Sequence, residues 1–192
     1  MSENKAAQQR EAHWGALSDL PGNPLMWIFI LSELLVFGGF FAAYGFARIG
    51  EREVFDASQA LLDPLVGGLN TMVLLTSGLF AALAIEARAR GSIARCRHWL
   101  FAAMALGAVF CTIKVIEYLQ KFGAGLTPDT NTFFTYYYLL TGFHFAHVVY
   151  GLLILALVAW RASEANVETG VAFWHMVDLI WIILYPLIYL LR

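Results

Sequence analysis

The stretch that most constrains the fold of this chain is residues 171–192, VAFWHMVDLIWIILYPLIYLLR. A hydrocarbon core of about 30 Å needs roughly 20 helical residues, and residues 171–191 reach that length with Asp178 as the only formal charge. A carboxylate at such a depth costs several kcal/mol unless it has a partner. His175 is the nearest candidate, because residues three apart share one face of a helix.

The composition favours an integral membrane protein. Apolar residues make up 60% of the chain and charged residues 14%, whereas soluble domains average about 45–50% and about 25%. A net charge of -2 gives no basic footprint for nucleic acid, so nucleic-acid binding is not expected. The two cysteines, Cys96 and Cys111, form no CxxC pair and predict neither a disulfide framework nor a thiolate metal site.

Five apolar runs predict an all-α bundle of five transmembrane helices. We place the spans at about residues 24–47, 64–87, 99–120, 132–160 and 171–191. Residues 1–23 are polar and mixed in charge, which predicts a solvated tail before a transmembrane domain at 24–192. We interpret residues 48–63 as a charged connection, and we expect Pro186 to kink the last helix.

Basic residues predict the orientation of the bundle. With five spans the two termini lie on opposite sides of the membrane. Seven basic residues fall on the side of the N-terminus and four on the other: Lys5, Arg10, Arg88, Arg90, Arg95, Arg97 and Arg161 against Arg48, Arg52, Lys121 and Arg192. The positive-inside rule then places the N-terminus in the cytoplasm and the C-terminus in the periplasm of a bacterial inner membrane.

Seven ionisable side chains lie inside the predicted spans, where such residues suggest function by default. They are Glu33, Lys114, Glu117, His144, His147, His175 and Asp178. Glu33 and Glu117 either tie helices together or contribute to a proton relay or lipid contact. Lys114 either neutralises Glu117 or extends toward the helix end near Lys121. Glu33 has no basic residue within two turns of its own helix, so we expect the neutral acid at pH 7.

The histidines allow two interpretations. His144 and His147 are three apart and could hold a metal from one helix face, but metal sites need three or four ligands, so structural histidines are favoured. One of them could face His175 across a haem, yet a hydrogen-bonded network explains the same residues without a cofactor and is favoured. The stripe of Trp174, Asp178, Trp181 and Tyr185 is interpreted as a helix contact surface.

Several segments resemble one known family. They are MWIFILSELLVFGGFFAAY, LNTMVLLTSG, the Glu117-Tyr118 pair, TGFHFAHVVYGLLIL and FWHMVDLIWIILYPLIY. In this order they resemble the last five helices of subunit III of haem–copper oxidases, and FHxxHVxxG followed by WHxVDxxW is specific for that family. NTFFTYYYLLTGFHFAHVVYG and the ETG before the last helix are most similar to the NorE branch, associated with nitric oxide reductase. Lys114 and Pro186 depart from the pattern of classical oxidase subunits.

The resemblance implies an accessory subunit that is not catalytic alone. It would support assembly, lipid binding or proton uptake of a catalytic haem-containing subunit. No cofactor is expected in this chain, and haem with copper or non-haem iron is expected in the partner. Glu33 falls on the family's carbodiimide-reactive glutamate. Glu117, His144, His147, His175 and Asp178 fall on its other polar positions, as structural or proton-environment residues without catalytic roles. Subunit III of a terminal cytochrome c or quinol oxidase stays open as an alternative. An autonomous proton or ion carrier and a haem-bearing membrane anchor are the alternatives of another class.

Overall fold

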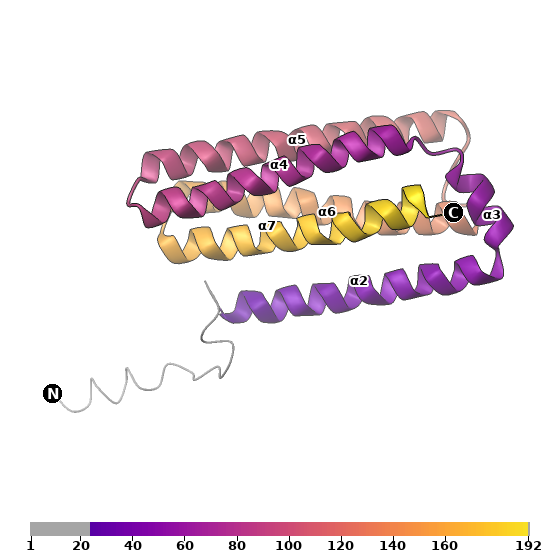
Figure 1. Ribbon diagram of the computed structural model, residues 1–192, viewed down its shortest axis with the longest axis horizontal. Helices are drawn as coiled ribbons and strands as arrows, with labels where there is room; N and C mark the ends of the chain where they lie inside the picture. The colour runs from indigo at the N-terminus through magenta and orange to yellow at the C-terminus, as the bar shows by residue number, and fades with distance from the viewer. Residues whose placement is uncertain (1–23, 192) are drawn as a thin grey trace, which may run out of the picture.

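The computed structural model describes residues 24–191, and these residues are helical almost throughout (Figure 1). The long helices are α2 (Pro24–Gly50), α4 (Pro64–Ala89), α5 (Ile93–Gly123), α6 (Thr132–Arg161) and α7 (Glu164–Tyr185). A short α3 (Arg52–Gln59) follows α2, and a π-helical turn, η2 (Pro186–Leu190), follows α7. Five helices are long and apolar enough to cross a membrane, which confirms the predicted number of spans. The tail predicted at 1–23, and residue 192, lie outside the described residues.

Two helices begin earlier than predicted. Helix α5 begins at Ile93 rather than at 99, and α7 begins at Glu164 rather than at 171. The predicted bounds followed hydropathy and therefore missed the polar first turns. At α7 the side chain of Ser163 accepts a hydrogen bond from the backbone N–H of Asn166, which satisfies one of the free donors at that helix start.

The connection predicted at 48–63 contains helix α3, which the sequence analysis missed. Helix α3 lies across the end of the bundle (Figure 1). It buries Phe55, whose ring centroid lies 5.2 Å from that of Tyr44 on α2 and 5.6 Å from that of Phe133 on α6. The charged residues of this segment thus lie on the outer side of an amphipathic helix.

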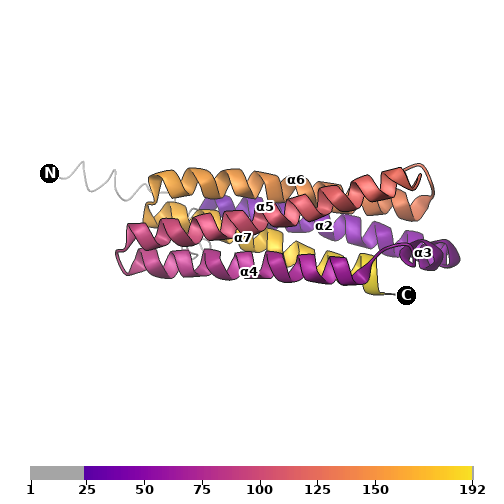
Figure 2. The ribbon, with the colours of Figure 1, turned by 90° about the horizontal axis from the view of Figure 1, so that it is seen from above.

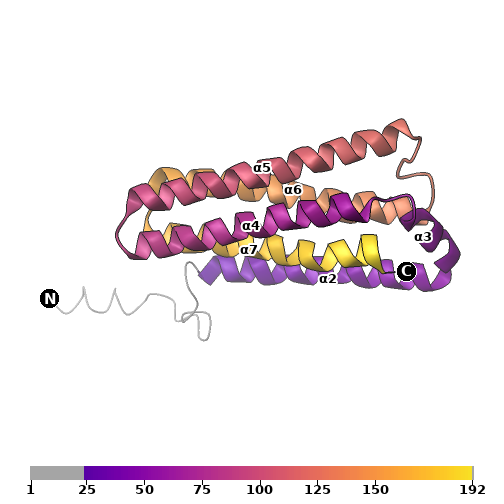
Figure 3. The same ribbon diagram turned by 45° about the horizontal axis from the view of Figure 1, so that its top comes forward.

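Helices α4 to α7 form a four-helix ring in which each helix packs against two others. Helix α2 lies along the outside of this ring, against α7 and α6, as the turned views show (Figures 2 and 3). Only 11% of the most apolar stretch of α2 is buried, against 56% for α7. Helix α7 is therefore the most buried of the five long helices, and α2 is the most exposed.

Large side chains of α7 close the ring against α4. The indole of Trp174 donates to Ser77 at 3.2 Å, and that of Trp181 donates to Thr71 at 2.9 Å. The hydroxyl of Tyr185 donates to the carbonyl of Pro64 at 3.0 Å. The prediction that this stripe is a helix contact surface is confirmed.

Pro186 changes the last helix as expected near its end. The α-helix stops at Tyr185, and the π-helical turn leaves two carbonyls available to other elements. Leu187 O accepts from the Tyr44 hydroxyl and from the Gln59 amide, each at 3.2 Å, and Ile188 O accepts from the same amide at 2.9 Å. The turn therefore joins α2 and α3 to the ring.

Candidate functional site

The most completely paired polar cluster surrounds Lys114 on α5, a residue that is only 1% exposed. Its ammonium donates to Glu117 Oε2 at 3.2 Å, to the Tyr137 hydroxyl at 3.3 Å and to the Tyr189 hydroxyl at 3.0 Å. Both tyrosines donate in turn to Glu117 Oε1, at 2.7 and 2.6 Å. The cluster joins α5, α6 and η2.

This geometry decides between the two predictions for Lys114. The predicted neutralisation by Glu117 is confirmed, since the two groups form a buried salt bridge. The alternative, in which Lys114 extends toward the helix end, is wrong. Lys121 lies there instead and donates to the carbonyl of Leu61. All three ammonium donors of Lys114 have oxygen acceptors, so burial leaves none of them unsatisfied.

Glu33 has a partner that the sequence analysis did not find. Its Oε2 lies 3.0 Å from Nε2 of His147 on α6, and Nδ1 of His147 lies 2.8 Å from the carbonyl of Phe143. A carbonyl only accepts, so Nδ1 carries a proton. The Nε2 contact then requires one further proton, either on Glu33 or on the imidazole. This partner lies on another helix, where the spacing of residues within α2 could not reveal it, and the neutral state of Glu33 stays a prediction.

His175 and Asp178 lie together as predicted, with Nδ1 of the histidine 3.5 Å from Oδ2 of the aspartate. Asp178 is buried, and its Oδ1 has no hydrogen-bond donor among residues 24–191. A Cβ atom at Gly78 on α4 would overlap Oδ2, so glycine is needed for this close approach.

His144 and His147 point to different neighbours. His147 contacts α2 through Glu33, whereas His144 is fully buried with its ring stacked on Trp181 at 5.0 Å. Neither nitrogen of His144 has a partner in the described part of the chain. No group of three or more potential metal ligands occurs there either. The spacing that suggested a shared metal therefore brings the two imidazoles to separate surroundings.

Two tyrosines of the Lys114 cluster were missed. Tyr137 lies in the span predicted at residues 132–160 but is not among the seven candidate residues, and it is fully buried. Its spacing of seven residues from His144 places both on one helix face and could have indicated burial. No comparable signal points to Tyr189, which reaches Glu117 from 72 residues further along the chain.

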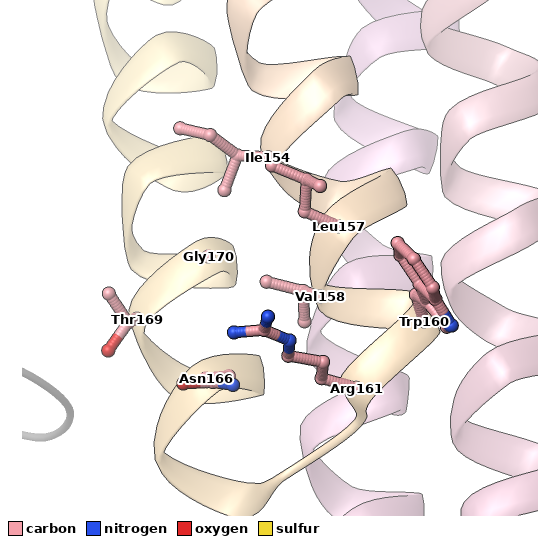
Figure 4. Close-up of a pocket in the computed structure, with 8 residues that line it drawn as sticks. All are labelled: Ile154, Leu157, Val158, Trp160, Arg161, Asn166, Thr169 and Gly170. Carbon is pink, nitrogen blue, oxygen red and sulfur yellow. The ribbon is translucent and has the colours of Figure 1, made fainter.

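A groove of about 420 Å³ lies between the end of α6 and the start of α7 (Figure 4). Its polar residues are Arg161, Asn166 and Thr169, and its apolar wall includes Ile154 and Leu157. The guanidinium of Arg161 extends between the two helices (Figure 4). It forms no hydrogen bond or ion pair within residues 24–191.

The nearby arginines Arg88 and Arg97 are engaged differently. Arg88 Nε donates to the carbonyl of Ala162 at 2.7 Å, and Arg97 donates to those of Ala159 and Trp160, both at 2.9 Å. They satisfy carbonyls at the end of α6 that have no partner inside the helix. Arg161 therefore differs from them in having no partner for its charge among residues 24–191.

Comparison with known proteins finds one family and relatives whose names agree with it. Residues 22–192 match the family described as cytochrome c oxidase subunit III. Cytochrome c oxidase subunit 3 of Thermostichus vulcanus is 38% identical over 173 residues, which cover 85% of this chain and 84% of that protein. Cytochrome bo(3) ubiquinol oxidase subunit 3 of Buchnera aphidicola is 24% identical over 179 residues, 86% of this chain and 84% of that protein.

A third relative is a longer protein. Heme-copper oxidase subunit I+III of Aeropyrum pernix is 29% identical over 179 residues, which cover 86% of this chain and 22% of that protein. The matched family spans all five long helices and every polar cluster described above. This chain therefore belongs to the cytochrome c oxidase subunit III family.

Proposed function

We propose that this chain is a non-catalytic accessory subunit of a respiratory haem–copper superfamily complex in the cytoplasmic membrane. The observation that carries the proposal is the family match over residues 22–192. The Lys114 and Glu33 clusters support it, because their polar atoms bond to one another across helices and leave no donor of Lys114 free for a substrate. Fully paired networks of this kind make a helix bundle rigid.

The partner that we infer is the catalytic haem-containing subunit. One relative is named subunit I+III and is a single chain. This supports an arrangement in which this chain lies beside the catalytic subunit. Haem, with copper or non-haem iron, would lie in that partner, and this chain would hold no cofactor of its own. Its buried carboxyls would support proton uptake by the partner.

We further propose that the complex reduces nitric oxide and that the chain belongs to the NorE branch. The segment NTFFTYYYLLTGFHFAHVVYG, the ETG before the last span, and Lys114 support this assignment. The oxidase names of the relatives support the alternative, subunit III of a terminal cytochrome c or quinol oxidase.

We base the proposal of lipid binding on the groove at Arg161. A guanidinium without a partner in the described part of the chain suits the phosphate of a phospholipid, and Ile154 and Leu157 would contact the acyl chain of that lipid. Trp160 also lines the groove and is a residue type enriched at membrane interfaces.

Capture of the native complex tests the proposal. The full chain, tagged at its C-terminus, is purified in mild detergent, the co-purifying subunits are identified by mass spectrometry, and oxygen and nitric oxide consumption are both measured. We expect a haem-containing catalytic subunit and consumption of nitric oxide. Consumption of oxygen alone would replace the NorE assignment by the oxidase alternative, and purification without such a subunit would contradict the accessory role.

A further inference from the structure

His144 on α6 is buried without a hydrogen bond. Its side chain is 0% exposed, and neither Nδ1 nor Nε2 bonds to any of residues 24–191. In either protonation state an imidazole needs a partner at both nitrogens, because each of them is a donor or an acceptor. An unpaired polar atom in a protein interior is destabilising, so His144 requires polar atoms that these residues do not supply.

Asn70 on α4 has a free acceptor in the same layer of the bundle. Its amide donates to the carbonyl of Phe110 at 3.3 Å, while its buried Oδ1 accepts no hydrogen bond from the described residues. The ring centroid of Phe110 lies 5.8 Å from that of His144. Trp181 stacks on His144 at 5.0 Å and donates to Thr71, the chain neighbour of Asn70. Both unpaired groups therefore lie beside the same two aromatic side chains.

Each of the four helices in the ring contributes one residue to this layer. Helices α4 and α6 are diagonal, because each packs mainly against α5 and α7. Phe110 of α5 and Trp181 of α7 meet with their ring centroids 4.9 Å apart and form an apolar wall. The polar atoms of Asn70 and His144 enter from the other two corners and do not bond to each other. Buried water typically occupies such positions, since one molecule makes about three hydrogen bonds to otherwise unpaired groups.

We propose that ordered water binds between His144 and Asn70 in the interior of the ring. The water pairs with the nitrogens of His144 and donates to Oδ1 of Asn70, so it joins the diagonal helices α4 and α6. A cation does not suit this place, because the ammonium of Lys114 lies 5.6 Å from the centroid of the Trp181 ring on which His144 stacks. The site belongs to the bundle itself and does not depend on the proposed catalytic partner.

X-ray radiolysis of the full chain, equilibrated in water enriched in heavy oxygen, tests the site directly. Bound water produces hydroxyl radicals in place, and these radicals oxidise the side chains next to it. We expect peptide mass spectrometry to find heavy oxygen on Phe110 or Trp181. Phe173 is the matched control and should stay unlabelled, because it is an equally buried ring on α7. Equal labelling of Phe173, or no label on Phe110 and Trp181, would overturn the proposal.

A substitution of His144 distinguishes a hydrated imidazole from one that is simply unpaired. His144→Phe keeps a ring that can stack on Trp181 and removes both nitrogens. With water bound, the variant loses hydrogen bonds, and the midpoint of thermal unfolding should fall by about 2–4 °C. Without water, the midpoint should rise, because an apolar ring replaces an unsatisfied polar one. A rise or an unchanged midpoint would therefore contradict the bound water.

Asn70→Leu tests the second partner of the water. This variant also loses the hydrogen bond to the carbonyl of Phe110, but that loss is the same with or without His144 and cancels in a double-mutant cycle. If both residues hold the same water, the midpoint of the double variant should fall by less than the sum of the two single shifts. Additive shifts would overturn the shared site. The radiolysis of the wild-type chain decides the proposal even where a variant fails to fold.

Discussion

Lys114 shows how a charged residue is tolerated in the interior of this bundle. A buried charge costs several kcal/mol unless attraction and hydrogen bonds offset its desolvation. Here the ammonium has three oxygen acceptors and lies 4.8 Å from the ring centroid of Tyr118. The Glu33–His147 contact uses one proton in a similar way to join α2 to α6. Asp178, by contrast, has one oxygen that accepts no hydrogen bond from residues 24–191.

The Glu33 pair leads to a prediction about chemical modification. Hydrophobic carbodiimides react with protonated carboxyls, so dicyclohexylcarbodiimide should label Glu33 in membranes. Glu33→Gln should abolish labelling and leave assembly nearly intact, because the amide still donates to Nε2 of His147. Peptide mass spectrometry locates the label, and Glu117, already paired with Lys114, should stay unmodified. Labelling that persists in Glu33→Gln, or loss of the complex in that variant, would show that the neutral-acid assignment is wrong.

Substitutions of Asp178 separate hydrogen bonding from packing. Asp178→Asn keeps an oxygen near His175, whereas Asp178→Leu removes it and costs about 1–3 kcal/mol. We therefore expect more intact complex with asparagine than with leucine, measured as co-purifying catalytic subunit in mild detergent. Equal losses in both variants would contradict the pairing with His175 seen at 3.5 Å.

At the scale of elements, the long helices could be predicted because the membrane requires long apolar runs. The starts of α2, α4 and α6 agree with the sequence, at Pro24, Pro64 and Thr132. Helix α3 could not be found this way, since eight residues give a weak pattern and their burial depends on α2 and α6. The hydrogen bonds that η2 accepts from Tyr44 and Gln59 join distant parts of the chain and could not be predicted either.

Gln59 provides a test of the contact between α3 and η2. Its amide donates to the carbonyls of Leu187 and Ile188, so Gln59→Met should leave both acceptors without that donor and destabilise the bundle by about 1–3 kcal/mol. Thermal unfolding of the purified chain should show a lower midpoint. Gln120→Met is the matched control, because Gln120 is exposed on α5. Equal midpoints for Gln59→Met and wild type would exclude a stabilising role for this contact.

At the scale of the molecule, the predictable part of the polar network is the part within one helix. The three-residue spacing predicted the pairs Lys114–Glu117 and His175–Asp178, because helical periodicity brings such residues to one face. The Glu33–His147 contact joins residues 114 positions apart in the sequence. The contact between Lys114 and Tyr189 joins residues 75 positions apart. Such contacts depend on how helices pack, which hydropathy does not specify.

The orientation of the bundle is a prediction for the whole molecule. The start of α2, the α4–α5 connection and the α6–α7 connection share one end, and the C-terminal end of η2 lies at the other (Figure 1). Alkaline phosphatase fused after Arg192 should therefore be active in the periplasm, and the same enzyme fused after Gly91 should be inactive. The reverse pattern would place the N-terminus outside.

We propose that this chain supports a haem-containing partner and binds no haem itself. An absorption spectrum, recorded on the tagged complex and again on the chain after the partner is stripped away, distinguishes the two possibilities. We expect a Soret band in the complex and none in the stripped chain. A Soret band that remains with the stripped chain would contradict it and identify the chain as a haem-bearing membrane anchor.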